Sequence, residues 1–151
     1  MAITAGDIKK LREETGAGVM DAKKALEEAQ GDFAKAKEAL KLAGVEKADK
    51  RSERTTSQGL VETYVHTGRV GAMVEVGCET DFVARTDEFK TLAKELSMQI
   101  ASMNPVDVED LLNQDYIRDP QKKIRDLVTE AVSKTGENIQ VKRFVRFTLG
   151  E

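Results

Sequence analysis

The stretch Val70-Gly-Ala-Met-Val-Glu-Val-Gly-Cys78 decides the fold class of this 151-residue chain. Its apolar side chains recur at every second position: Val70, Ala72, Val74 and Val76. A period of two is typical of a β-strand with one buried face. The preceding run Leu60–His66 is also rich in β-branched residues, and His66-Thr-Gly-Arg69 between them has turn composition. The two runs are therefore predicted to form an antiparallel hairpin.

The sequence after the hairpin predicts helices and one more strand. Thr86-Asp87-Glu88 is a helix start, and the long apolar-striped helix that follows should end at Pro105. A second helix is predicted from about Pro120 to Lys134. We expect the final strand to carry one apolar face: Ile139, Val141, Val145, Phe147 and Leu149. The fold class is thus α+β, with a small antiparallel three-stranded sheet covered by helices on one side.

The amino-terminal part has helical periodicity. Thr4 and Asp7 have the spacing of a capping box, which predicts a first helix. Gly16-Ala-Gly18 interrupts that helix, and Gly31-Asp32 offers a stop and a new N-cap for a third one, which should end near Gly44. Three short helices with alanine-rich seams predict a compact bundle.

A change of composition separates the bundle from the sheet. Residues 46–58 mix both charges and lack an apolar stripe, which is the composition of a linker, although the charge mixture could support a solvated helix in its first half. We therefore predict three parts: a three-helix bundle over 1–45, a charged linker over 46–58 and an α+β core over 59–151.

Composition excludes several classes of protein. The formal charge is −3 and the isoelectric point is near 5.4, which argues against a dedicated nucleic-acid binder. No apolar run approaches the roughly 18 residues of a membrane span, and the first residues lack the apolar segment of a signal peptide. A single cysteine favours a reducing compartment. We expect a cytoplasmic protein that binds neither nucleic acid nor membrane.

Residues suited to catalysis are scarce. A thiol enzyme would need Cys78 beside His66, the single histidine, and neighbouring strands leave such a contact possible. A small buried cysteine that packs as a hydrophobe is the simpler interpretation. The sequence has no zinc-ligand spacing and no phosphate-binding glycine motif. We therefore expect a non-catalytic protein without metal or cofactor.

Two motifs carry more information. In Thr15-Gly-Ala-Gly-Val-Met-Asp21, Val19 and Met20 start a helix, where two adjacent apolar side chains cannot both point inward, so at least one should be exposed to a partner. In Cys78-Glu-Thr-Asp-Phe-Val-Ala-Arg85, a carboxylate and an aromatic ring occupy a tight loop between strand and helix. The ring and Val83 could cap the hydrophobic layer while Asp81 caps a turn, or the exposed ring could enter a crevice of a partner.

These motifs resemble the bacterial and organellar elongation factor Ts family. The similar text is Leu11–Leu26, then Val76-Gly-Cys-Glu-Thr-Asp-Phe-Val-Ala-Arg85, then Gly136-Glu-Asn-Ile139 leading into Arg143–Phe147. The resemblance implies a guanine-nucleotide exchange factor that binds the translational GTPase elongation factor Tu and promotes release of GDP. It also implies that the bundle is similar to ubiquitin-associated domains.

The resemblance implies roles for individual residues. Phe82 would wedge between two helices of the GTPase, with Thr80 and Val83 beside it, and Asp81 would disturb the network of water around Mg²⁺. From the bundle, Arg12, Val19 and Met20 would hold a further helix of the nucleotide-binding domain, and His66 is a possible additional contact. The alternative hypothesis is a helical protein-interaction module unrelated to exchange.

The chain departs from the family at a few points. Gly77 stands where the family usually has Asn, and Val19 where it often has Met. The text similar to the carboxyl end of the family begins near Leu111, so the second half-core and coiled-coil arm of long members are missing, and with them contacts to the third domain of the GTPase. A sheet with an uncovered edge or face invites a second copy, so a two-fold homodimer is expected; the alternative is a monomer whose charged surface keeps it soluble.

Overall fold

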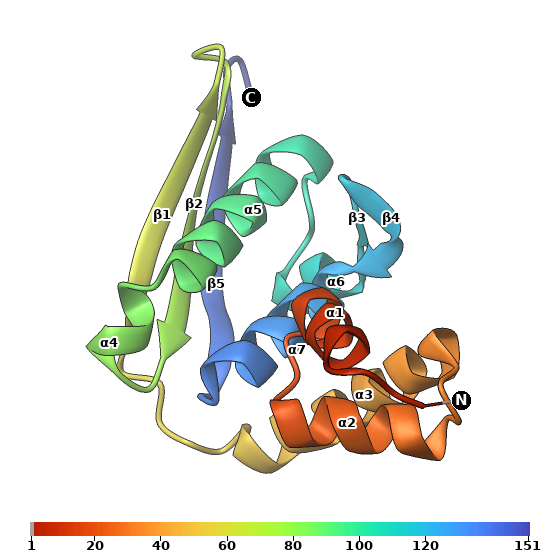
Figure 1. Ribbon diagram of the computed structural model, residues 1–151. Helices are drawn as coiled ribbons and strands as arrows, with labels where there is room; N and C mark the ends of the chain where they lie inside the picture. Colours follow the sequence, from red (N-terminus) through yellow and green to blue (C-terminus); the bar gives the residue numbers. More distant parts are fainter. Residues whose placement is uncertain (1) are drawn as a thin grey trace.

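The computed structural model describes residues 2–151 and joins a helical bundle to a sheet with helices on one face (Figure 1). The elements follow in this order: α1 (Ala5–Thr15), α2 (Val19–Glu28), α3 (Phe33–Arg51), β1 (Gln58–His66), β2 (Val70–Cys78), α4 (Asp81–Ala84), α5 (Asp87–Met103), α6 (Val108–Asn113), β3 (Asp115–Tyr116), β4 (Asp119–Lys123), α7 (Ile124–Thr135) and β5 (Ile139–Thr148). Within residues 2–151, every helix is too short or too polar to cross a membrane.

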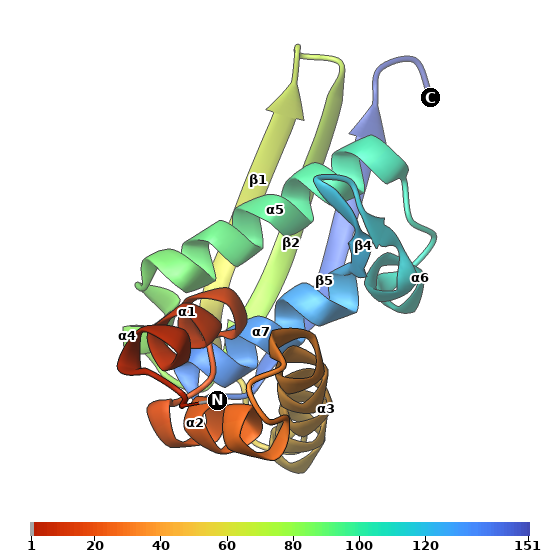
Figure 2. The ribbon, with the colours of Figure 1, turned by 45° about the vertical axis from the view of Figure 1, so that its right-hand side comes forward.

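The main sheet has the order β1-β2-β5, and both pairings are antiparallel. Helix α5 crosses one face of this sheet, and α7 packs beside it (Figure 2). Buried side chains of α5, among them Phe89 and Leu96, meet Val74 and Val76 of the central strand in one core. The α+β class and the three-stranded antiparallel sheet are confirmed, as is the buried alternation along β2.

The apolar side chains of β5 do not share one face, so that prediction is wrong. Val141 pairs with Val76 and Arg143 with Glu75, which leaves Lys142 as an extra residue in a β-bulge. A bulge inverts the facing of every later residue relative to simple alternation. Phe144 therefore packs against the core, while Val145 and Phe147 point to the other face and are exposed.

The face of the sheet turned away from α5 keeps exposed apolar side chains. They come from all three strands: Val61, Val65, Met73, Val145 and Phe147. We call this set the outer sheet face. The Glu75 carboxylate and Arg143 Nε form an ion pair of 2.8 Å on the same face.

Two helix boundaries differ from the sequence prediction. Helix α3 continues through Gly44 to Arg51, because Gly44 is buried where α3 meets α7, and a Cβ there would lie 3.1 Å from Ser133 Oγ. The glycine thus permits close packing of two helices instead of ending one. Helix α7 begins at Ile124 and not near Pro120, since the Asp126 carboxylate accepts a hydrogen bond from Lys123 N at 2.9 Å. Helix α6 and the small β3–β4 sheet, which includes Pro120, were not predicted.

The bundle has a small core of its own, formed by Leu11, Ala22, Ala25, Leu26 and Ala36. The predicted capping box is present, because Asp7 N donates to Thr4 Oγ1 and Thr4 N donates to Asp7. The backbone N and the hydroxyl of Thr4 both donate to the Asp7 carboxylate, at 2.9 and 2.8 Å, and these two hydrogen bonds hold the pKa of that carboxyl below its usual value. Asp32 caps α3 as predicted, with Lys35 N as donor.

Candidate functional site

An exposed aromatic residue lies in the short turn that follows the central strand. Helix α4 is a single turn, and Thr80 is its N-cap, accepting a hydrogen bond from Val83 N at 3.4 Å. Phe82 is 78% exposed, whereas Val83 is half-buried against the core. Asp81 does not cap the turn; it is exposed and forms an ion pair of 3.2 Å with Arg85. The structure thus presents an aromatic ring and a carboxylate side by side on the surface.

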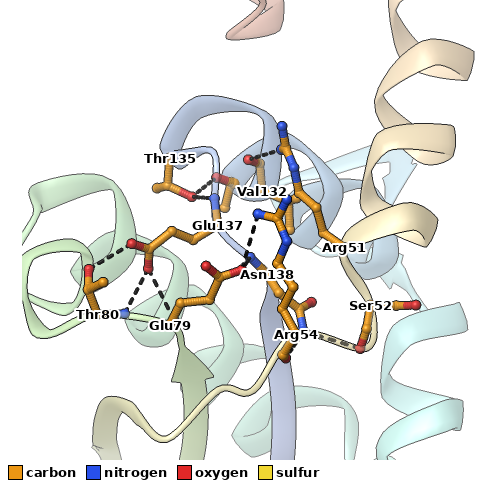
Figure 3. A network of polar contacts seen from close by, with 10 residues as sticks. Arg51, Ser52, Arg54, Glu79, Thr80, Val132, Thr135, Glu137 and Asn138 are labelled. Carbon is orange, nitrogen blue, oxygen red and sulfur yellow. Dashed lines mark hydrogen bonds and ion pairs between the residues drawn. The ribbon is translucent and has the colours of Figure 1, made fainter.

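A polar network holds the loop that leads into α4 (Figure 3). Glu137, in the turn between α7 and β5, accepts hydrogen bonds from Glu79 N at 3.1 Å and from Thr80 N at 2.9 Å. The Thr80 hydroxyl donates to the second oxygen of the same carboxylate at 2.7 Å. Backbone and side chain of the N-cap residue are therefore both fixed by one carboxylate.

The same turn holds the connection from the bundle. Asn138 is almost fully buried, and its Nδ2 donates to the carbonyl oxygens of Ser52 at 3.2 Å and Arg54 at 2.8 Å. Its backbone N donates to Glu79 Oε1 at 2.9 Å, and Arg54 lies 3.6 Å from that same oxygen. In the sequence, Gly136-Glu-Asn-Ile139 stands out only as one of the motifs that resemble the family, and nothing in it predicts that Glu137 and Asn138 bind distant backbone groups.

A second exposed apolar feature lies where α2 begins. Val19 is 49% and Met20 72% exposed, so both side chains face outward where at least one was expected to. Arg12 reaches this place from α1, because its Nε donates to the carbonyl oxygen of Ala17 at 3.3 Å. The residues that the resemblance selects in the bundle thus lie around one turn.

Cys78 and His66 lie at opposite ends of the hairpin. In the register of β1 and β2, His66 pairs with Val70 while Cys78 pairs with Gln58, which rules out contact between the two. The Cys78 thiol is fully buried and donates to Thr80 O at 3.1 Å, and its burial raises the pKa above the usual value. The exposed His66 has its Nδ1 2.8 Å from the Tyr64 hydroxyl. The geometry of a thiol enzyme is absent from this hairpin.

Metal ligation finds no support in the part of the chain that the structure describes. Among residues 2–151, three or more His, Cys, Asp or Glu side chains nowhere gather in a way that could hold a metal ion. The surface around α4 presents instead the exposed ring of Phe82 and the exposed carboxylate of Asp81.

Comparison with known proteins identifies the family. A profile described as Elongation factor TS matches residues 79–151. Proteins named elongation factor Ts from Thermodesulfovibrio yellowstonii, Coprothermobacter proteolyticus and Thermotoga maritima are 42%, 44% and 44% identical, over all of this chain and 98–100% of their own length. Fold and relatives define a translation elongation factor. The chain belongs to the elongation factor Ts family.

This chain is shorter than those relatives. The alignment with the Thermodesulfovibrio protein runs over 195 residues, and this chain has 151, so at least 44 aligned positions have no counterpart here. Both ends of the chain are nevertheless included in the alignment, since all of it is covered. The additional sequence of the relatives therefore lies between segments that align with this chain.

Proposed function

We propose that this protein is a guanine-nucleotide exchange factor that binds elongation factor Tu and promotes the release of GDP. The physical basis is linkage: a protein that prefers the nucleotide-free GTPase weakens GDP binding by the same factor. Such a protein needs a surface that intrudes into the GTPase, and it needs no catalytic group of its own. Its place of action is then the cytoplasm, where translation occurs.

Exposure of Phe82 is the observation that carries this proposal. An aromatic ring that is 78% exposed on a firmly held turn is a ready anchor for a crevice between two helices. Asp81 lies beside it, and Thr80 and Val83 complete the turn. In a P-loop GTPase, Mg²⁺ and backbone amides hold the β-phosphate of the nucleotide. A carboxylate brought near the water around that Mg²⁺ would weaken the hold on GDP.

The bundle supplies the second contact in this proposal. Met20 and Val19 are exposed together, and Arg12 braces the turn before them. Two contact surfaces on one chain raise the effective concentration of each for its site, which increases affinity without any new contact. His66 lies at the far end of the hairpin from α4, so any contact that it makes would be separate from these two.

Release of fluorescent GDP from elongation factor Tu tests the proposal. Phe82→Ala should slow the stimulated release at least tenfold, because loss of an anchoring aromatic commonly costs about 2 kcal/mol or more. Asp81→Ala should also slow it. Val106→Ala is the control, since Val106 is 88% exposed and lies beyond the far end of the 17-residue helix α5. Exchange at the unmodified rate in both α4 variants would refute the assignment.

We further propose that two copies pair through the outer sheet face. Its five apolar side chains are 41–73% exposed and span all three strands. Antiparallel sheets commonly pack face to face, and closed two-fold dimers are the most frequent soluble homo-oligomers. Glu75 and Arg143 lie on the same face, so the carboxylate of one copy could form an ion pair with the guanidinium of the other.

A further inference from the structure

The α4 turn does not have the means to hold itself in place. It has four residues, and a single helical turn is unstable in isolation because nucleation fixes several dihedral angles for one hydrogen bond. Thr80 Oγ1 accepts only a long hydrogen bond from Val83 N, at 3.4 Å. Two kinds of contact from outside therefore determine where Phe82 and Asp81 point: the packing of Val83 and Ala84 against the core, and the polar contacts of the N-cap end.

We infer that Glu137 is the positioning residue for the Asp81–Phe82 turn, an inference that rests on the proposed exchange function. Its carboxylate accepts hydrogen bonds from two successive backbone amides, those of Glu79 and Thr80, and from the Thr80 hydroxyl. Glu137 is 57 residues from Thr80 in the sequence, so its carboxylate joins two turns that are distant along the chain. Glu137 touches no partner in this scheme and acts through the turn.

For holding the turn, the length of the Glu137 side chain matters more than its negative charge. The two amides converge on one carboxylate oxygen, and only the hydroxyl uses the other. A glutamine keeps one acceptor oxygen at the same distance from the backbone, so it can accept from both amides. An aspartate keeps the charge, but its oxygens are withdrawn by one methylene and cannot reach both amides from the same backbone position.

The neighbouring residue Asn138 fixes the segment that connects the sheet to the bundle. It is 3% exposed and binds the carbonyl oxygens of Ser52 and Arg54, where the chain leaves α3. The Glu137–Asn138 turn therefore holds the α4 turn with one residue and the bundle connection with the next. Such preorganisation of two contact surfaces lowers the ordering cost of binding a single partner.

A fluorescent probe can test the clamp without any partner. The chain contains no tryptophan, so the Phe82→Trp variant has a single tryptophan, in the α4 turn, which red-edge excitation selects over the two tyrosines. In that background Glu137→Ala and Glu137→Asp should lower the fluorescence anisotropy of the indole, while Glu137→Gln should leave it nearly unchanged. Glu130→Ala is the matched control, because it removes a carboxylate from α7 whose ion pair, of 2.9 Å, is with Lys122 of β4.

GDP release from elongation factor Tu is the second measurement, made with Phe82 in place. Glu137→Ala and Glu137→Asp should reduce the maximal stimulated rate about tenfold, and Glu137→Gln should remain within about threefold of the unmodified protein. Glu130→Ala should be unchanged. Far-UV circular dichroism identifies any variant that fails to fold, in which case the aspartate and glutamine variants carry the comparison.

The outcomes separate this inference from the proposed function. Unchanged anisotropy in the alanine and aspartate variants overturns the clamp, whatever the exchange assay gives. Lowered anisotropy with exchange at the unmodified rate also overturns the positioning role. If the unmodified protein fails to stimulate GDP release, the proposed function fails, while lowered anisotropy still supports Glu137 as the residue that holds the α4 turn. An aspartate variant that behaves like the unmodified protein shows that charge suffices, and overturns the argument from reach.

Discussion

At the scale of single residues, Cys78 shows how burial controls chemistry. Its thiol lies in the core, donates to Thr80 O, and experiences the negative charges of Glu137 and, more weakly, Asp81. Burial first, and then that charge, raises its pKa above the usual value of 9.0. The thiolate, which is the reactive form, is therefore suppressed near neutral pH.

The raised pKa predicts both reactivity and a pH dependence. In the native protein Cys78 should react with a disulfide reagent at about pH 8 far more slowly than in the unfolded chain. A thiol whose pKa is raised by folding stabilises the protein below its unfolded pKa, and this contribution is lost as the pH rises above that value. The free energy of unfolding should thus fall above about pH 9, as measured by urea denaturation.

A matched variant isolates the thiol in that measurement. Cys78→Ala removes the titrating group, so its free energy of unfolding should fall less steeply with pH than that of the unmodified protein. Tyr116 titrates higher, because burial and its hydrogen bond to Glu95 raise its pKa to about 12. Equal slopes in the two proteins between about pH 8 and pH 10 would contradict the prediction.

At the scale of elements, the bundle and the sheet have separate cores. The buried residues of the bundle and those of the α+β core form two clusters that share no member. Between them α3 faces α7 across polar contacts, such as Arg51 Nη1 to Val132 O at 3.3 Å and Lys41 to Asp126 at 3.5 Å. A crevice of about 450 Å³ also runs along this boundary. We propose that the two parts are separate domains.

Removal of the bundle tests this division. Deletion of residues 1–52 should leave a fragment that unfolds cooperatively, because every buried residue of the sheet core lies at Ala72 or later. Binding to elongation factor Tu should weaken severely, since Arg12, Val19 and Met20 are removed. Circular dichroism and titration calorimetry measure the two effects. Binding as tight as that of the full chain would show that the bundle makes no contact, and an unfolded fragment would refute independent domains.

At the scale of the whole molecule, the uncovered sheet face determines the expected assembly. A mass near twice 16.7 kDa is expected from light scattering at micromolar concentration. Phe147→Glu, at the most exposed position of the outer sheet face, should shift the mass toward that of one chain, because a buried unpaired charge is costly. Val106→Glu introduces the same charge away from that face and should not. A mass of one chain at every concentration would contradict the dimer.

Local signals in the sequence determined much of this protein. The alternation along Val70–Cys78 predicted the central strand, and Thr4, Asp32 and Thr86 predicted helix starts that the structure confirms. The paired apolar residues at the start of α2 were expected to include an exposed one, and both are exposed. Strand alternation and helix caps depend on residues only a few positions apart, so they can be recognised in the sequence without the tertiary structure. The family resemblance could be recognised in the same way, because each of its motifs is a short contiguous run of sequence.

Only the tertiary structure decided the features that depend on distant residues. The bulge at Lys142 turns Phe144 inward, and nothing in the alternation of β5 announces it, because its position is set by pairing with β2. In the sequence Gly44 predicts the end of a helix, whereas in the structure it lies inside α3 at the contact with α7. The contact of Glu137 with Thr80 joins two turns that are far apart in the chain. Sequence periodicity predicts which side chains share a face only where no bulge interrupts the pairing, and the partner of a buried polar group is fixed only when the elements pack together.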